Sequence, residues 1–242
     1  MDGEIRVNAQ KLRRRKKLFR ISVVLLVILI IIITIVYAAV SFIYNGYYFA
    51  ITLDKDLYLK NKVVIYDDPN YKIFRSVIQV ESLDFFDNIS EKWLPEDIDG
   101  SGGSHNGDSY LAYTFYIENM GDETVDYYNE LIIDDVVKNM DEAIRFKIYY
   151  DGNATTYAKK SLSGNPEQGT TAFKDDNLVV RQKVSNFKPK QIHKYTLVMW
   201  VEGNDPECTN NILGGELKAH FDFKSYHKEG RKWNLWMKII MT

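Results

Sequence analysis

Residues 21–53 constrain this chain more than any other segment, because they contain no Asp, Glu, Lys, Arg or His. Residues 21–43 are almost entirely aliphatic, and at ~1.5 Å rise per residue a helix of that length is about 34 Å long. The hydrocarbon core of a bilayer is ~30 Å thick, so this segment predicts a transmembrane helix. Its many isoleucines do not favour a strand, because in lipid every backbone polar group must be paired within the segment.

A basic segment directly precedes the apolar one. Residues 1–20 hold eight Lys or Arg and two Asp or Glu, and therefore carry +6. Because the whole chain carries −2, the remaining residues carry −8. Basic flanks of a transmembrane helix stay in the cytoplasm, which predicts a cytoplasmic N-terminus and an extracellular body. An acidic body argues against nucleic acid as a partner, since phosphate binding needs positive charge.

These patterns divide the chain into four parts. We expect a basic cytoplasmic segment (1–20), a transmembrane helix acting as a signal anchor (21–44), an extracellular β-sandwich (45–228) and an amphipathic C-terminal tail (229–242). The expected location is the cell membrane, crossed once, and the lipid bilayer is the first expected partner. A cleaved signal peptide stays open as an alternative, because residues 36–38 resemble a cleavage site, although the apolar run exceeds the usual ~7–15 residues.

Beyond the membrane segment, apolar residues alternate with polar ones, as is typical of strands with one packed face. The clearest apolar rows are Leu111, Tyr113, Phe115 and Ile117; Ile144, Phe146, Ile148 and Tyr150; Tyr195, Leu197, Met199 and Val201; and Leu217, Ala219, Phe221 and Phe223. In the second row, Arg145 and Lys147 are expected to face water. Further strands are predicted near residues 47–53, 62–66, 72–86, 124–134 and 177–184.

Turn sequences such as Asp151-Gly152-Asn153 separate these rows. Many short strands without a long amphipathic helix predict an all-β fold, a single β-sandwich. Residues 99–108 are expected to form a loop, with helical turns at 137–143 and near 207–209. In the tail, four apolar residues fall at helical spacing, so it is expected to pack on the sandwich or to lie on the outer leaflet. They are Trp233, Trp236, Met237 and Ile240.

The sequence contains none of the common catalytic spacings: no HExxH, GxSxG, phosphate-binding loop or CxxC pair. Its four histidines are scattered, and Cys208 is the single cysteine, expected to be partly buried. A dyad of Cys208 with a histidine has little support, because nothing near Cys208 supplies the positive charge that lowers a thiol pKa. We therefore predict no catalytic residue, no cofactor, no metal ligand and no enzymatic activity.

Two acidic loops carry the carboxylate oxygens that calcium prefers. One contains Asp97, Asp99 and Asp108, and the other contains Glu202, Asp205 and Glu207. Neither has the spacing of an EF-hand loop, so both are expected to be hydrated turns.

Several blocks resemble a known group of proteins. They are residues 110–119 followed by Gly121, residues 134–143, the Phe187-Lys188-Pro189 turn, and residues 200–209 with 214–216. Over residues 45–226 the chain resembles uncharacterised membrane-anchored surface proteins of Gram-positive bacteria, and more distantly the TasA/camelysin family. The resemblance implies a jelly-roll-like sandwich at the cell surface whose partners are other copies of itself or other cell-surface proteins. It also implies assembly by addition of the strand at residues 47–53 to a neighbour.

The first functional hypothesis is therefore a non-enzymatic surface protein with a structural or interaction role. Two alternatives stay open. One is a camelysin-like secreted metallopeptidase, although this sequence has no zinc-ligand spacing to support that activity. The other is a carbohydrate- or small-ligand-binding module, in which Trp93 and Trp200 stack on sugar rings.

Overall fold

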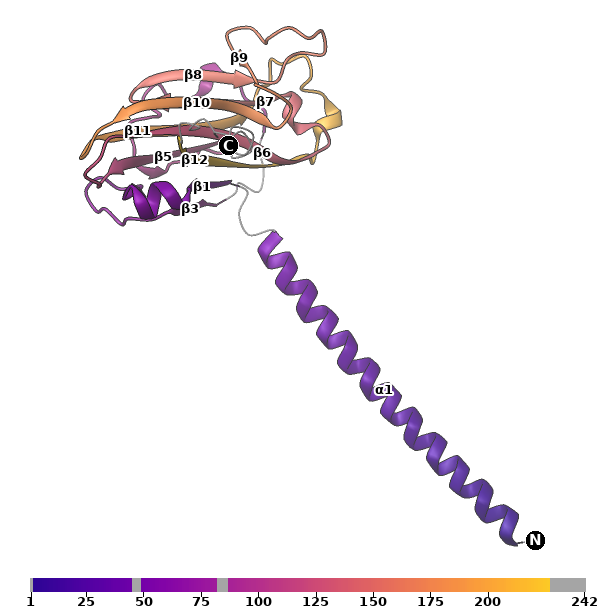
Figure 1. Cartoon of the computed structure of the whole chain (residues 1–242). Helices are drawn as coiled ribbons and strands as arrows, with labels where there is room; N and C mark the ends of the chain where they lie inside the picture. The colour runs from indigo at the N-terminus through magenta and orange to yellow at the C-terminus, as the bar shows by residue number, and fades with distance from the viewer. Residues whose placement is uncertain (1, 45–48, 82–86, 227–242) are drawn as a thin grey trace, which may run out of the picture. The chain divides into compact units, whose positions relative to one another are not determined.

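The computed structural model describes residues 2–44, 49–81 and 87–226. The chain divides into two compact units, Met1–Gly46 and Tyr47–Thr242, which are described separately. The first unit is a helix, α1 (Asp2–Tyr44) (Figure 1). Over its described residues, the second contains twelve β-strands and four short helical turns. The basic segment predicted to precede the transmembrane helix is thus part of the same helix.

Within α1, the region Ala9–Ser41 is long and apolar enough to cross a membrane, with a mean hydropathy of 3.4 in its most apolar window. Its Ile, Leu and Val side chains are exposed on every side of the helix. A helix that is apolar all round is stable only in apolar surroundings. The hydroxyls of Ser22 and Thr34 donate to the carbonyls of Phe19 and Ile30, both at 2.9 Å, so these two polar side chains are satisfied within the helix.

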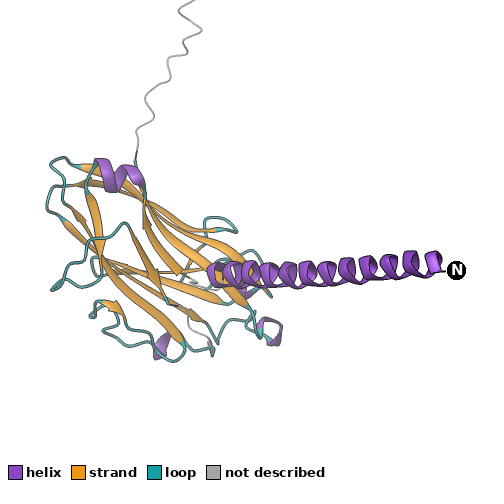
Figure 2. Cartoon of the chain, turned by 90° about the horizontal axis from the view of Figure 1, so that it is seen from below, coloured by secondary structure: helices purple, strands orange, loops and turns teal. Residues whose placement is uncertain are grey.

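The second unit is built on two sheets (Figures 1 and 2). The five-stranded sheet has the order β10 (Leu178–Phe187), β6 (Val125–Val137), β12 (Glu216–Ser225), β1 (Phe49–Leu53) and β3 (Val77–Val80). The seven-stranded sheet has the order β2 (Val63–Tyr66), β5 (Tyr110–Asn119), β11 (Ile192–Val201), β7 (Ile144–Tyr150), β8 (Asn153–Ala158) and β9 (Thr171–Ala172), with β4 (Gly103–Ser104) beside β5. The pairs β1–β12 and β8–β9 are parallel, and the other paired strands are antiparallel.

The apolar rows predicted from alternation meet between the two sheets. Phe115 of β5 lies 6.0 Å from Phe221 and 5.7 Å from Phe223 of β12, measured between ring centroids. Tyr195 of β11 stacks on Phe115 at 5.6 Å, and all four rings are fully buried. Burying a side chain of this size stabilises the fold by about 1.5–3 kcal/mol. The unit is therefore a mostly β domain with a sandwich-like core, as the alternation predicts.

A second apolar cluster covers the outer face of the seven-stranded sheet. Its buried members are Ile98, Ala112, Val198 and Trp200, and Ile89 and Leu94 pack against it. Strand β11 is consequently buried on both faces, which its mixed sequence did not indicate. On the neighbouring strand β7, Arg145 pairs with Trp200 and is buried as well. The prediction that Arg145 faces water is wrong, since it is 4% exposed.

Other differences from the sequence predictions are local. The strand expected at residues 72–86 is the shorter β3, and residues 82–86 and 47–48 lie outside the described residues. The loop expected at 99–108 contains the two-residue strand β4, while β8, β9 and the π-helical turn η1 (Asp56–Lys60) were not predicted. The expected helical turns correspond to η3 (Met140–Glu142) and η4 (Asn210–Ile212), the second slightly later than predicted. The remaining turn is η2 (Glu91–Trp93), and the tail at 229–242 lies outside the described residues.

A histidine on the outer face of the five-stranded sheet links two strands. His220 of β12 lies between Asp134 of β6, at 2.8 Å from Nδ1, and Asp222, at 3.4 Å from Nε2. The hydrogen bond with Asp222, helped by Asp134, raises the pKa of His220 to about 9 against the opposing effect of burial. The protonated imidazole therefore holds β6 and β12 together at neutral pH.

Stability should depend on the ionisation of His220. Its pKa in the folded chain is above the ~6.5 of the unfolded chain, so its contribution is complete below about pH 6.5 and is lost as the pH rises through about 9. Because the His220 side chain is partly exposed, we expect the free energy of unfolding to fall by about 1–2 kcal/mol, which is less than the full pKa shift would give. Urea unfolding of the full chain at about pH 6 and about pH 10 measures it. The matched variant His220→Gln should lack this component, and an equal pH dependence in both proteins would contradict the assignment.

Candidate functional site

A pocket of about 530 Å³ lies where several loops meet the seven-stranded sheet. Its walls come from η2, from β7, from the loop before β9 and from the loop after β11. It is lined by Ser90, Glu91, Lys92, Arg145, Glu167, Gln168, Thr170, Glu202, Asn204, Asp205 and Pro206. Four of these residues are acidic and two are basic, so the lining is polar with an excess of negative charge.

The loop after β11 is held against η2 by backbone and side-chain hydrogen bonds. The amide of Ile89 donates to Val201 O, and the amide of Gly203 donates to Ile89 O, both at 2.9 Å. A Cβ at Gly203 would lie 2.9 Å from Asn88 Oδ1, so a larger residue there would displace the end of the exposed Asn88 side chain. Glu202 Oε2 accepts from the amide of Glu91 and from Trp200 Nε1, both at 3.0 Å. Buried Trp200 thereby fixes one wall of the pocket.

Arg145 is the buried charge at the base of the pocket. Its strand position places it opposite Trp200 of β11, a buried member of the second apolar cluster. One guanidinium nitrogen, Nη1, donates to Ile144 O at 3.2 Å, and Nη2 donates to Asp205 Oδ2. The Nη2 atom also lies 3.9 Å from Glu167 Oε2. The Arg145 side chain is 4% exposed and that of Asp205 is 0% exposed, so each depends on the other for its charge balance.

Three carboxylates meet beside Arg145 and form what we call the carboxylate cluster: Glu167, Asp205 and Glu207. One oxygen of each lies within 4.8 Å of the others. Asp205 Oδ1 accepts from the amide of Glu207 at 2.8 Å, and Glu207 Oε1 accepts from the amide of Leu162 at 3.1 Å. The other oxygen, Glu207 Oε2, is enclosed and has no hydrogen-bond partner among the residues that the structure describes.

The cluster holds more negative charge than Arg145 balances. Burial raises the pKa of Asp205, and the neighbouring Glu207 carboxyl raises it further, against the Glu207 amide and Arg145. Burial also raises the pKa of Glu167, with the charge of Asp205 acting in the same direction. Two neighbouring carboxyls that resist ionisation can share a proton.

The composition of the cluster limits its chemistry. Carboxylate oxygens are ligands that hard cations such as calcium prefer. Zinc sites are usually built with histidine or cysteine, and the cluster contains neither. The arrangement can therefore share a proton or hold a hard cation, while Arg145 already occupies one side of it.

The two acidic loops singled out in the sequence behave differently. In the second, Asp205 and Glu207 come together, whereas Glu202 turns to Trp200 and Glu91. Glu167 and Arg145 complete the site from distant parts of the chain, and no sequence signal pointed to them. In the first loop, Asp97 and Asp108 are exposed and Asp99 is half-buried, and they form no such cluster within residues 87–226.

The described histidines have partners other than Cys208. His105 is hydrogen-bonded to the carbonyls of Ile98 and Gly103, His193 to Tyr127, and His220 to Asp134. Cys208 is half-buried against the core, as expected, and burial raises the pKa of its thiol. Of the two tryptophans considered for sugar stacking, Trp200 is 0% exposed and is excluded, whereas Trp93 is 73% exposed.

Comparisons with known proteins assign no family to the chain. No protein-family model matches it, and no curated protein matches it. A solved structure of the β-glucosidase from Kluyveromyces marxianus in complex with glucose is similar at 15% identity and a TM-score of 0.22. The selenomethionine-labelled form of that enzyme is similar at 16% identity and a TM-score of 0.25. Each covers 66% of this chain, but the chain spans only 15% and 17% of those proteins, and likeness at this level carries no functional argument.

Proposed function

We propose that this chain is a single-pass membrane protein with its N-terminus in the cytoplasm and a jelly-roll-like sandwich at the cell surface, where it has a structural or interaction role. The observation that carries the proposal is the apolar region Ala9–Ser41, whose exposed side chains need lipid around them. The orientation is supported by the basic residues that precede it, since basic flanks remain in the cytoplasm.

A binding role is supported by the pocket beside the carboxylate cluster. At about 530 Å³ it is within the size range of small-ligand sites, and it has carboxylate, amide, hydroxyl and guanidinium groups for orienting a ligand. A small-ligand-binding module is therefore the second candidate function. The metallopeptidase alternative gains no support from the carboxylate cluster, because it offers neither histidine nor cysteine to zinc.

Assembly by strand addition would have to compete with the chain's own pairing. Strand β1 lies between β12 and β3, with Phe49 beside Ala219 on one side and Val80 on the other. Donating β1 to a neighbour would break both ladders. Assembly with other copies or with surface proteins is thus proposed to use surfaces outside this strand.

The proposed role is tested on cells that carry the full chain. A membrane-impermeant lysine cross-linker should join the chain to a second copy or to another surface protein, because lysines such as Lys174 and Lys188 are exposed. The purified full chain in detergent should leave casein uncut. Monomeric protein after cross-linking, together with casein cleavage that a chelator abolishes, would contradict the proposal and favour the peptidase.

A further inference from the structure

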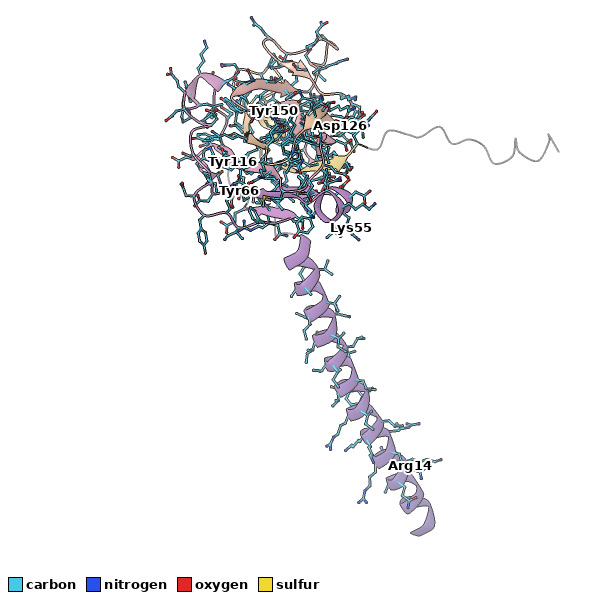
Figure 3. All side chains as sticks on the ribbon, turned by 60° about the vertical axis from the view of Figure 1, so that its left-hand side comes forward. Arg14, Lys55, Tyr66, Tyr116, Asp126 and Tyr150 are labelled. Atoms are coloured by element: carbon cyan, nitrogen blue, oxygen red, sulfur yellow. The ribbon has the colours of Figure 1, made fainter. Side chains whose placement is uncertain are left out.

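The basic residues before the apolar run form a ring around α1, which we call the basic collar. Its members are Arg13, Arg14, Arg15, Lys16, Lys17 and Arg20. All of them are helical and all are exposed. Figure 3 shows side chains projecting from all sides of this helix, with Arg14 labelled among them.

The ring follows from helical geometry. Successive residues of an α-helix are rotated by about 100°, so five consecutive basic residues point in directions that cover the whole circumference. A helix that lies flat on a membrane instead keeps its charges on one face. The collar therefore suits a helix whose axis passes through the layer of lipid headgroups.

The collar is slightly longer than that layer is deep. From Arg13 to Arg20 the helix rises by about 10 Å, and the headgroup region on each side of a bilayer is about 5–8 Å thick. Ile21, the next residue, begins the uncharged run. Long basic side chains can extend along the helix to keep their charges at headgroup level. Residues 5–20 contain no Asp or Glu that would neutralise the collar.

We infer that the basic collar binds anionic phospholipid headgroups around the helix and so selects the lipids next to it. This inference rests on the proposed membrane span. The orientation of the helix across the membrane requires only an excess of Lys and Arg in the cytoplasmic segment. A ring of charges at headgroup depth additionally places a cation next to each neighbouring lipid. The attraction is worth about 1 kcal/mol per basic residue near the surface, which corresponds to about a five-fold preference for a charged over a neutral headgroup.

The test uses the full chain reconstituted in vesicles of phosphatidylcholine with about one fifth phosphatidylglycerol. Spin-labelled forms of each lipid report their relative association with the protein. The wild type should prefer phosphatidylglycerol about five-fold at ~0.1 M salt and lose most of this preference at ~1 M salt. Replacing Arg13, Arg14, Arg15, Lys16 and Lys17 by Gln leaves only Arg20 of the collar and should remove most of the preference at ~0.1 M salt.

The matched control changes the same number of charges outside α1. It replaces the exposed residues Lys55, Lys160, Lys174, Lys188 and Lys190 by Gln and should keep the wild-type preference. An equal preference in the wild type and the collar variant, or none in the wild type, would overturn the inference. So would tight binding of a DNA oligonucleotide by the collar without any lipid preference. Carbonate extraction of each sample shows whether the chain is inserted in the bilayer, because carbonate removes chains that are not. These outcomes can therefore be distinguished from a wrong assignment of the membrane span.

Discussion

Replacing Ile30, Ile31 and Ile32 by Asp is expected to release the chain from the membrane. These residues lie at the middle of the apolar run, where each Asp costs about 3–4 kcal/mol more than the isoleucine it replaces. The three changes therefore cost about 9–12 kcal/mol. Some 20 apolar residues at about 0.3–0.6 kcal/mol each supply only about 6–12 kcal/mol for insertion. The cost equals or exceeds the whole driving force.

Carbonate extraction of cell membranes measures this result. The wild type should remain in the pellet, and the variant should move to the soluble fraction with its β domain still folded. The matched control replaces the same three isoleucines by Leu and should stay in the membrane. Retention of the triple Asp variant would show that something other than α1 holds the chain there, and the anchor would be wrongly assigned.

Replacing Arg145 by Met is expected to destabilise the β domain by about 3–5 kcal/mol, because it leaves Asp205 charged, buried and unpaired. Met keeps much of the apolar volume, so the loss reports charge rather than packing. The remaining neighbours, Glu167 and Glu207, are acidic and make the uncompensated charge worse. Urea unfolding of the full chain, followed by tryptophan fluorescence, measures the loss, and buried Trp200 beside Arg145 is a local reporter.

Two controls identify the cause. The double variant Arg145→Met with Asp205→Asn removes both charges and keeps an oxygen to accept from the Glu207 amide, so it should recover most of the stability. The stability of the single variant Arg145→Met should also recover as the pH falls. Burial raises the pKa of Asp205 in the folded chain, so the folded form takes up the proton first and gains stability relative to the unfolded form. Equal losses in the single and double variants would mean that Arg145 acts through packing.

The strands could be predicted where apolar and polar residues alternate along the sequence. Phe115, Phe221 and Phe223 alternate with polar residues, and each is buried between the sheets. The signal failed where a third layer covers a sheet. Exposure of the outer face of β7 to water depends on residues 89–98, which come from another part of the chain. Strand β8 was missed because the side chains of its first half are small or polar and all exposed, which gives no alternation to detect.

The site could be predicted only in part, for a similar reason. Asp205 and Glu207 are close in sequence, and their grouping follows from one turn. Glu167 and Arg145 reach the same place through the pairing of β7, β8, β9 and β11, which no local pattern encodes. An isolated arginine in a strand is ordinarily solvated, and its burial here depends on a carboxylate some sixty residues away. Membrane insertion, by contrast, depends on one contiguous segment.

Labelling of single cysteines in intact cells shows on which side of the membrane each unit of the chain lies. In a Cys208→Ala background, Leu162→Cys places a thiol at the most exposed large apolar position among residues 49–81 and 87–226, and Leu12→Cys places one in the basic part of α1. With a membrane-impermeant maleimide, the Leu162→Cys chain should be labelled in intact cells and the Leu12→Cys chain only after permeabilisation. Labelling of the Leu12→Cys chain in intact cells, with the Leu162→Cys chain protected until lysis, would contradict the proposed orientation.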